Sequence, residues 1–353
     1  MKHSHLLLLA FLLLRTAFGE PNQARVHVVV AVSGQVEVKH GEAGQYQHVA
    51  FGAQLSDLDL IHLGDGARVQ IVCADLTMAP ELVERYSGVP CRKDTPVILN
   101  RGGVFFGPVR SSGQPSGFPM ILGPRATRIL NPAPTIAWTA VAGTTAYRVS
   151  ILNTNWSTEV RGAIRVQYPK TAPALVPNKD YRVTVVVTAP ASLAGLSSEA
   201  ESQADLGFTV LPETQAKTVS DAKARIGAFN TSSLAKRFLT ALIYSDNKLR
   251  YEAIGMLHSL WSELPEFAVA EELADLYRAT GIDTEAAKWY AEASKMAPND
   301  EDRARAFEGL AMASISDRAK AAEAAQQALL SFRKVGNEES VKRMERLLKI
   351  VGR

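Results

Sequence analysis

The 353-residue sequence has no apolar run long enough to cross a membrane as a helix, and it has little excess charge. Its longest apolar run, Leu6 to Leu14, has nine residues, where a helix that spans a bilayer needs about 20. The 39 Lys and Arg residues against 36 Asp and Glu residues give a net charge of +3, and no region forms a basic patch that would attract nucleic acid. A hydrophobic content of 46% is typical of globular proteins and argues against overall disorder.

The common catalytic motifs are also missing. There is no Gly-x-Ser-x-Gly elbow, no phosphate-binding loop ending in Gly-Lys-Ser/Thr and no His-Glu-x-x-His helix. Asp57, Asp59 and Asp65 surround a turn, where backbone hydrogen bonding explains them more simply than a calcium loop does. Five histidines follow the first 19 residues, none paired at metal-ligand spacing: His27, His40, His48, His62 and His258. We therefore predict no catalytic residue, no cofactor, no metal and no enzymatic activity.

The first 19 residues have the pattern of a secretory signal. Lys2 supplies a positive start, the apolar run follows, and Ala17 and Gly19 place small residues before a cut at Glu20. An N-terminal anchor that is not cleaved is the alternative. The pattern predicts an exported protein, periplasmic first and secreted second, with no transmembrane segment in the mature chain.

The sequence has only two cysteines, Cys73 and Cys91. In an exported protein, such a pair at loop-closing distance favours a disulfide. Two buried thiols or a redox switch are the alternatives. Without a histidine cluster nearby, the pair does not predict a zinc site.

Residues 20–110 have the texture of an all-β domain. Valine-rich or alternating runs are VHVVVAV, QVEV and RVQIV, and Val36 and Val38 are expected to share one face of a strand. From Val28 to Thr77, the strand after Ser33-Gly34, the Leu-rich turn and the outgoing strand resemble a FecR-type periplasmic domain. The resemblance departs at Leu58 to Gly64, where that family has Gly-Asp, Ile and then Thr-Gly. It implies a sensor that relays signals across the inner membrane.

Residues 111–123 are rich in Gly, Ser and Pro and predict a linker. Residues 124–212 predict a β-sandwich, with Trp138 in its core and Tyr181 at a corner before the alternating run RVTVVV. This pattern resembles a fibronectin type III or related immunoglobulin-like domain. Trp156 lies beyond a strand, so an exposed platform for glycans is one alternative for it.

Residues 213–353 predict an all-α region with a helical repeat. Small residues, bulky apolar residues and, in two units, a closing proline recur at matching positions about every 34 residues. The three units are Ala241, Tyr244, Ala253, Leu257, Leu260 and Pro265; Ala274, Tyr277, Ala286, Tyr290, Ala293 and Pro298; and Gly309, Met312, Ala321, Ala325 and Ala328. The pattern resembles a tetratricopeptide repeat array from Leu234 to Lys334. Residues 221–229 are predicted to form a leading helix, and Ser232 or Ser233 is predicted to cap the N-terminus of the first repeat helix. Residues 337–351 are predicted to form a polar helix that caps the end of the array.

Such arrays resemble docking surfaces, and their first helices line a groove. The repeat phase places seven polar residues toward that groove as candidate partner contacts: Lys236, Arg237, Thr240, Glu271, Glu272, Asp275 and Arg278. A solvated helix face explains the same residues without any partner. The combined prediction is a multidomain, exported, non-enzymatic scaffold that binds protein partners. The alternatives are a FecR-like envelope sensor and a binder of cell-wall glycan such as peptidoglycan.

Overall fold

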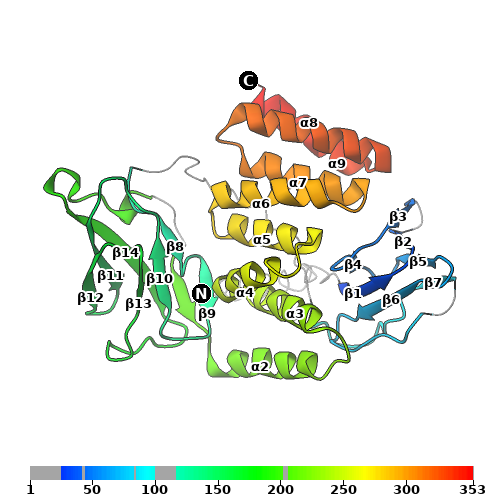
Figure 1. The fold of residues 1–353 in the computed structure, drawn as a ribbon, viewed down its shortest axis with the longest axis horizontal. Coiled ribbons are helices and arrows are strands. Elements are labelled where there is room, and N and C mark those ends of the chain that lie inside the picture. Colours follow the sequence, from blue (N-terminus) through cyan, green and yellow to red (C-terminus); the bar gives the residue numbers. More distant parts are fainter. Residues whose placement is uncertain (1–24, 42–43, 83–84, 100–116, 202–205, 353) are drawn as a thin grey trace, which may run out of the picture.

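The computed structural model describes residues 25–41, 44–82, 85–99, 117–201 and 206–352. Within these ranges, strands occupy the N-terminal part and eight α-helices the C-terminal part, which confirms the predicted β-then-α layout (Figure 1). The predicted signal segment and residues 111–116 of the predicted linker lie outside the described residues.

The N-terminal β region holds two small sheets with strand orders β4-β1-β6 and β3-β2-β5-β7. Both Val36 and Val38 are fully buried, as the alternation predicts. The strands are β1 (His27–Ser33), β2 (Val36–Lys39), β3 (Tyr46–His48), β4 (Gln54–Leu55), β5 (Leu60–Leu63), β6 (Arg68–Val72) and β7 (Tyr86–Gly88).

The second β region holds two further sheets, β13-β10-β8 and β12-β11-β14-β15-β9, around one core. Trp138 is fully buried in this core, as predicted. The strands are β8 (Ile121–Gly123), β9 (Thr127–Ile129), β10 (Thr135–Trp138), β11 (Ala146–Leu152), β12 (Ser157–Arg161), β13 (Arg165–Gln167), β14 (Asp180–Ala189) and β15 (Phe208–Val210). The end of the range predicted as a linker therefore forms β8, which pairs with β10.

Alternation along β14 explains how its residues reach the core. Tyr181, Val183, Val185 and Val187 are all buried, two residues apart on one face. The Tyr181 hydroxyl accepts a hydrogen bond from the Val176 N–H at 2.7 Å and so closes the turn before the strand.

The helical region consists of three antiparallel helix pairs between a leading and a final helix. Its helices are α2 (Glu213–Gly227), α3 (Ser233–Asp246), α4 (Arg250–Trp261), α5 (Phe267–Ala279), α6 (Asp283–Met296), α7 (Asp300–Ala313), α8 (Arg318–Val335) and α9 (Glu338–Val351). The Ser232 hydroxyl caps α3, as predicted. The leading helix begins eight residues earlier than predicted, directly after Pro212, which suits the start of a helix. None of the helices between residues 213 and 352 combines the length and hydropathy that a membrane crossing requires.

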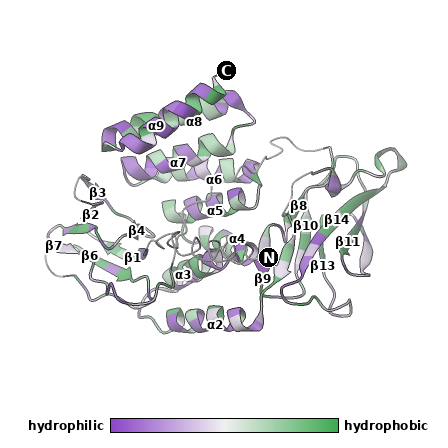
Figure 2. Cartoon of the chain, turned by 180° about the vertical axis from the view of Figure 1, so that it is seen from behind, coloured by the Kyte–Doolittle hydropathy of each residue, from purple (hydrophilic) through white to green (hydrophobic). Residues whose placement is uncertain are grey.

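Small and aromatic residues fill the contacts between helices at the predicted phase. Ala241, Ala274 and Ala286 have no exposed surface, and the Tyr290 ring is 3% exposed. The final helix α9 buries Val341 and Met344 and turns lysines and arginines outward, as expected of a cap. Figure 2 shows apolar and polar residues alternating around these helices.

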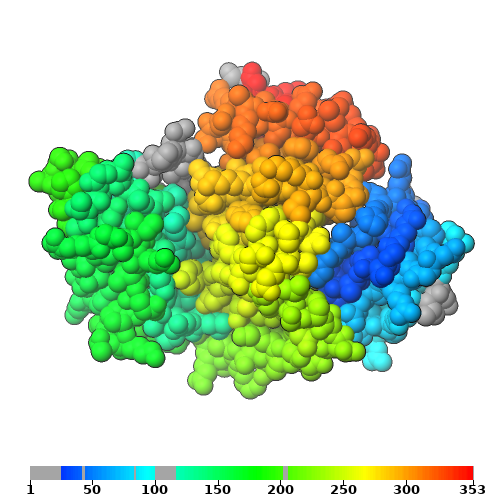
Figure 3. All heavy atoms as spheres, in the orientation of Figure 1, coloured from blue at the N-terminus to red at the C-terminus, as the bar shows by residue number. Residues whose placement is uncertain are grey.

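The helices lie between the two β regions, which cover opposite sides of the array (Figures 1 and 3). On the N-terminal side, the Phe51 ring packs on Phe238 of α3 with centroids 5.1 Å apart. Beside it, Gly52 has φ +79°, and a Cβ there would lie 2.2 Å from the Cβ of Ala268. Only glycine fits this close approach of a turn to a helix.

Two glycines inside helices predict opposite results on substitution by alanine. A Cβ at Gly309 of α7 would lie 2.2 Å from the buried Tyr290 ring, whereas a Cβ at Gly255 of α4 would meet open space. We expect Gly255→Ala to raise the free energy of unfolding by about 0.5–1 kcal/mol through helix propensity. Gly309→Ala should lower it by about 1–3 kcal/mol through overpacking. Urea unfolding of the two variants side by side checks this, and equal signs would contradict the packing described.

Candidate functional site

The three candidate partner contacts on α3, Lys236, Arg237 and Thr240, form hydrogen bonds within the protein itself. Lys236 donates a hydrogen bond to the Gly227 carbonyl at 2.8 Å. Thr240 is 8% exposed, and its hydroxyl donates to the Lys236 carbonyl. The two terminal nitrogens of Arg237 contact Glu263 and Ser259 at 2.6 and 2.9 Å. These groups tie α3 to α2 and α4.

The four candidate contacts from α5 are largely enclosed. Glu271 and Glu272 are 6% and 3% exposed, and Arg278 is half-buried. Glu271 accepts two bonds from Arg305 of α7, at 3.0 and 3.2 Å, and Asp275 accepts the Tyr290 hydroxyl at 2.5 Å. Partner binding by these residues stays a prediction, and their described contacts join neighbouring helices.

The N-terminal β region also contacts the start of α7. Gln47 donates to Glu301 at 3.0 Å, and the Asn299 amide donates to the His48 carbonyl at 2.9 Å. Asp302 lies next to this contact with its side chain 13% exposed. Burial raises the pKa of Asp302 to about 6; Glu271 and Glu301 also raise it, and Arg305 opposes them.

The raised pKa of Asp302 predicts a pH-dependent stability. Because the folded value of about 6 exceeds the ordinary 3.8, the stabilisation is complete below pH 3.8 and is lost as the pH rises through 6. Relative to Asp302→Asn, the wild type should lose about 1–3 kcal/mol of unfolding free energy between pH 4 and pH 7. Urea titrations of both proteins measure this difference in unfolding free energy. The other titratable groups are the same in both proteins, so their contributions cancel. A difference that stays constant across the range would contradict it.

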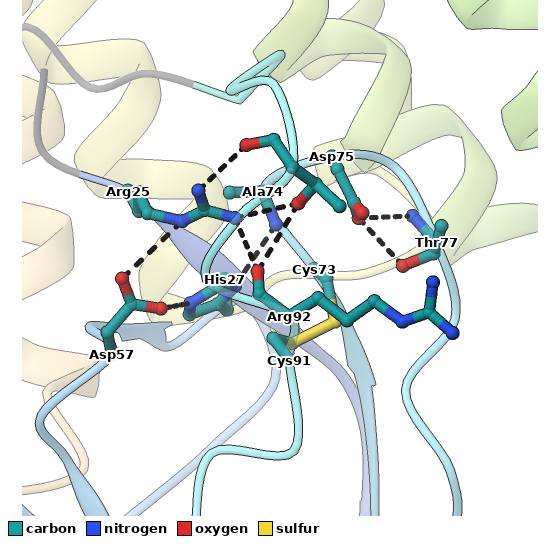
Figure 4. The surroundings of a disulfide bond; sticks show 10 residues. Arg25, His27, Asp57, Cys73, Ala74, Asp75, Thr77, Cys91 and Arg92 are labelled. Carbon is teal, nitrogen blue, oxygen red and sulfur yellow. Dashed lines mark hydrogen bonds and ion pairs between the residues drawn. A yellow bond between two sulfur atoms is a disulfide. The ribbon is translucent and has the colours of Figure 1, made fainter.

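The disulfide between Cys73 and Cys91, predicted from the sequence, is present. Figure 4 shows it beside His27, which is fully buried and bonded to Asp57 at 2.9 Å. The other ring nitrogen of His27 accepts the Ala74 N–H at 3.0 Å, so the proton lies on the nitrogen that faces Asp57. Among the described residues, His27 and the two cysteines are the one group close enough to hold a metal. The sulfur–sulfur bond and the two hydrogen bonds of His27 occupy all three in this state.

A cavity lies between the second β region and the helices. This cleft, the β8–α4 cleft, has a volume of about 500 Å³, within the range of small-ligand sites. One wall is the outward side of β8 and β10, and the other is α4 with the turn from α5 to α6. Its lining comprises Met120, Leu122, Gly123, Arg125, Ala137, Thr139, Tyr251, Glu252, Ile254, Gly255, Tyr277, Thr280, Ile282, Thr284 and Glu285.

Polar contacts at its edges hold the two walls of the cleft together. The Tyr251 hydroxyl donates to the Thr135 carbonyl at 3.1 Å, and Glu252 accepts the Leu130 N–H at 2.6 Å. Arg125 is fully buried and donates to Glu201 and to the Thr280 carbonyl. The cleft is thus a space between two fixed surfaces.

Several polar groups of the cleft are engaged in structural bonds, whereas the Oε2 atom of Glu252 is buried without a hydrogen-bond partner among the described residues. Burial raises the pKa of Glu252, and it raises the pKa of Tyr277 to about 12. The Thr139 hydroxyl accepts the Met120 N–H, and the Thr280 hydroxyl donates to the Tyr277 carbonyl. The apolar walls suit the binding of a ligand.

The sequence reading missed this cleft, although one signal for it exists. Gly255 is an exposed glycine in the interior of α4, where it costs about 1 kcal/mol relative to alanine. Gly255 lines the cleft, and a Cβ there would meet open space. No protein-family model matches the sequence, and no curated protein shows significant similarity to it.

Proposed function

We propose that the protein is an exported, non-catalytic adaptor that binds an apolar segment of a partner protein in the β8–α4 cleft. The observation that carries this proposal is the cleft itself, with its fixed walls, its mainly apolar lining and the open space beside Gly255. The helical array serves as the scaffold that holds the two β regions apart.

The finer identities of the regions are part of the same proposal. A sandwich of the immunoglobulin or fibronectin type III kind is supported by buried Trp138 between two sheets and by the hydroxyl of Tyr181 at a corner. Helix pairs spaced by about 34 residues support tetratricopeptide-like repeats. The valine-rich strands 27–39 and 68–72 are compatible with a FecR-like domain. The disulfide and the signal-like N-terminus favour export to the periplasm, or secretion.

Photo-crosslinking from the rim of the cleft tests the binding function. Thr284 is exposed on the rim, so a benzophenone amino acid there should crosslink an apolar segment of a partner in an envelope extract. Gly255→Trp should abolish the crosslink, because Gly255 lines the cleft, a Cβ there meets open space, and an indole would occupy part of the cleft. Gln326→Trp, at an exposed position of α8, is the matched control. A crosslink that survives Gly255→Trp would remove the cleft as the binding site.

Glycan binding is a second candidate function. The aromatic rings that favour it lie on the N-terminal sheet and do not include Trp156, the ring considered from the sequence. Trp156 is half-buried and packs edge-on against Tyr168, at a centroid distance of 4.9 Å. On the N-terminal sheet, by contrast, Tyr46 and Tyr86 are 39% and 59% exposed, and Tyr86 stacks on His62 at 4.5 Å. Co-sedimentation with purified sacculi that is lost in Tyr86→Ala would support this candidate.

A further inference from the structure

Four aromatic side chains lead away from the β8–α4 cleft in mutual contact; His258 is exposed and the other three are half-buried. We define them as the aromatic strip: Tyr277, His258, Trp289 and Trp261. Tyr277 lines the cleft, and its hydroxyl lies 2.6 Å from a ring nitrogen of His258. His258 in turn packs against Trp289 at 5.3 Å, and Trp289 against Trp261 at 5.1 Å. The four side chains are thus in unbroken contact.

The rings of the strip meet at steep angles and do not form a flat platform. The interplanar angles are 67° between His258 and Tyr277, 68° between His258 and Trp289 and 87° between the two indoles. Adjacent faces at such angles form notches, which fit a compact ring such as pyrrolidine better than a broad sugar face. Because the rings already pack on one another, little side-chain entropy is lost when a ligand binds.

The strip offers hydrogen-bond donors to its ligand. Neither indole N–H, of Trp261 or Trp289, has a hydrogen-bond partner among the described residues, and an indole nitrogen only donates. A polypeptide of prolines has carbonyl acceptors and no backbone N–H, whereas a helix already uses most of its carbonyls internally. A β-strand brings as many donors as acceptors.

The length of the strip matches a short extended segment. Tyr251, Gly255, His258 and Trp261 follow one side of α4. Ten residues of helix at 1.5 Å each extend about 15 Å, which equals about five residues of a polyproline II helix at 3.1 Å each. Such a helix docks on aromatic grooves because it is already extended before binding.

We propose that the partner binds as a proline-rich segment in the polyproline II conformation, laid from the cleft along the aromatic strip. This inference rests on the proposed function and adds the chemistry of the ligand. Its prolines lie in the notches between the rings, and its carbonyls accept from the two indoles. Ligands that need a cation to bind an anionic group are disfavoured, because Arg125 at the cleft is bonded to Glu201.

Fluorescence anisotropy with labelled decaproline tests this inference on the full chain. We expect saturable binding that a Gly-Ser decamer does not show. Trp289→Phe keeps a ring and removes one donor, and should weaken binding about two- to tenfold. Gly255→Trp should abolish binding, and Trp156→Phe, outside the strip, should leave it unchanged. Circular dichroism and urea midpoints equal to those of the wild type establish that each variant is folded.

The outcomes separate this inference from the proposed function. If decaproline does not bind while the crosslink from Thr284 persists and depends on Gly255, the polyproline inference is wrong and the cleft remains a binding site. If a chitin hexasaccharide binds the strip in place of decaproline, the inference is wrong and the ligand is a glycan. If decaproline binds equally well to Trp289→Phe and Gly255→Trp, it binds elsewhere and the inference is wrong.

Discussion

Replacing Arg125 with alanine is expected to lower the free energy of unfolding by about 3–5 kcal/mol. The side chains of Arg125 and Glu201 are 0% and 4% exposed and form two bonds of 2.5 and 2.6 Å. Removing the guanidinium leaves the Glu201 carboxylate buried without its partner, and a lone buried charge is costly. The Thr280 carbonyl loses its 2.6 Å donor as well.

Because Arg125 precedes β9 while Thr280 directly follows α5, the substitution also weakens the junction between the second β region and the helices. We expect the variant to be cut faster by protease between residues 123 and 130 under native conditions.

Urea unfolding, followed by circular dichroism, measures the expected loss. The double variant Arg125→Met/Glu201→Leu should recover most of it, since replacing a buried ion pair by apolar residues is often neutral. Lys217→Ala is the control, because Lys217 and Asp221 form an exposed pair that contributes less than about 1 kcal/mol. If Arg125→Ala unfolds at the same urea midpoint as Lys217→Ala, the buried ion pair with Glu201 and the bond to the Thr280 carbonyl do not stabilise the protein as described.

Features with a local period could be predicted from the sequence, because the period states which side of an element is buried. Alternating valines placed β2 and β14 correctly, and the spacing of Ala241, Ala274 and Ala286 identified the buried side of the helices. What covers that side has no local signal. Contacts such as Gln47 with Glu301 join residues 254 positions apart, so no window of sequence reveals them.

The candidate groove residues illustrate the same limit. Glu271 has the charge of a solvated side chain, yet it is 6% exposed because Arg305 of the next helix pair neutralises it. The β8–α4 cleft was missed for a related reason. Its two walls, residues 120–139 and 251–285, are far apart in the sequence, and contacts such as those of Arg125 and Tyr251 bring them together.

Opening the disulfide is the second change with a large expected effect. In the chain-entropy view, a bond that closes a loop of 18 residues contributes about 3 kcal/mol. The segment that follows Cys91 also carries contacts that tie the N-terminal β region together (Figure 4). Arg25 donates to the carbonyls of Arg92, Lys93 and Thr95 at 2.5 to 2.8 Å, and Leu99 is 2% exposed in the core shared with the first helices.

We therefore expect Cys73→Ala/Cys91→Ala to lower the free energy of unfolding by about 2–4 kcal/mol. Dithiothreitol should lower the urea midpoint of the wild type to that of the double variant and should leave the variant unchanged. Thiol titration confirms that the bond has opened in each sample. If the reduced wild type keeps its midpoint, the contacts of Arg25 and Leu99 hold the segment on their own, and the disulfide contributes little to stability. The expected loss instead means that the cross-link itself stabilises this β region beyond what the contacts of Arg25 and Leu99 supply.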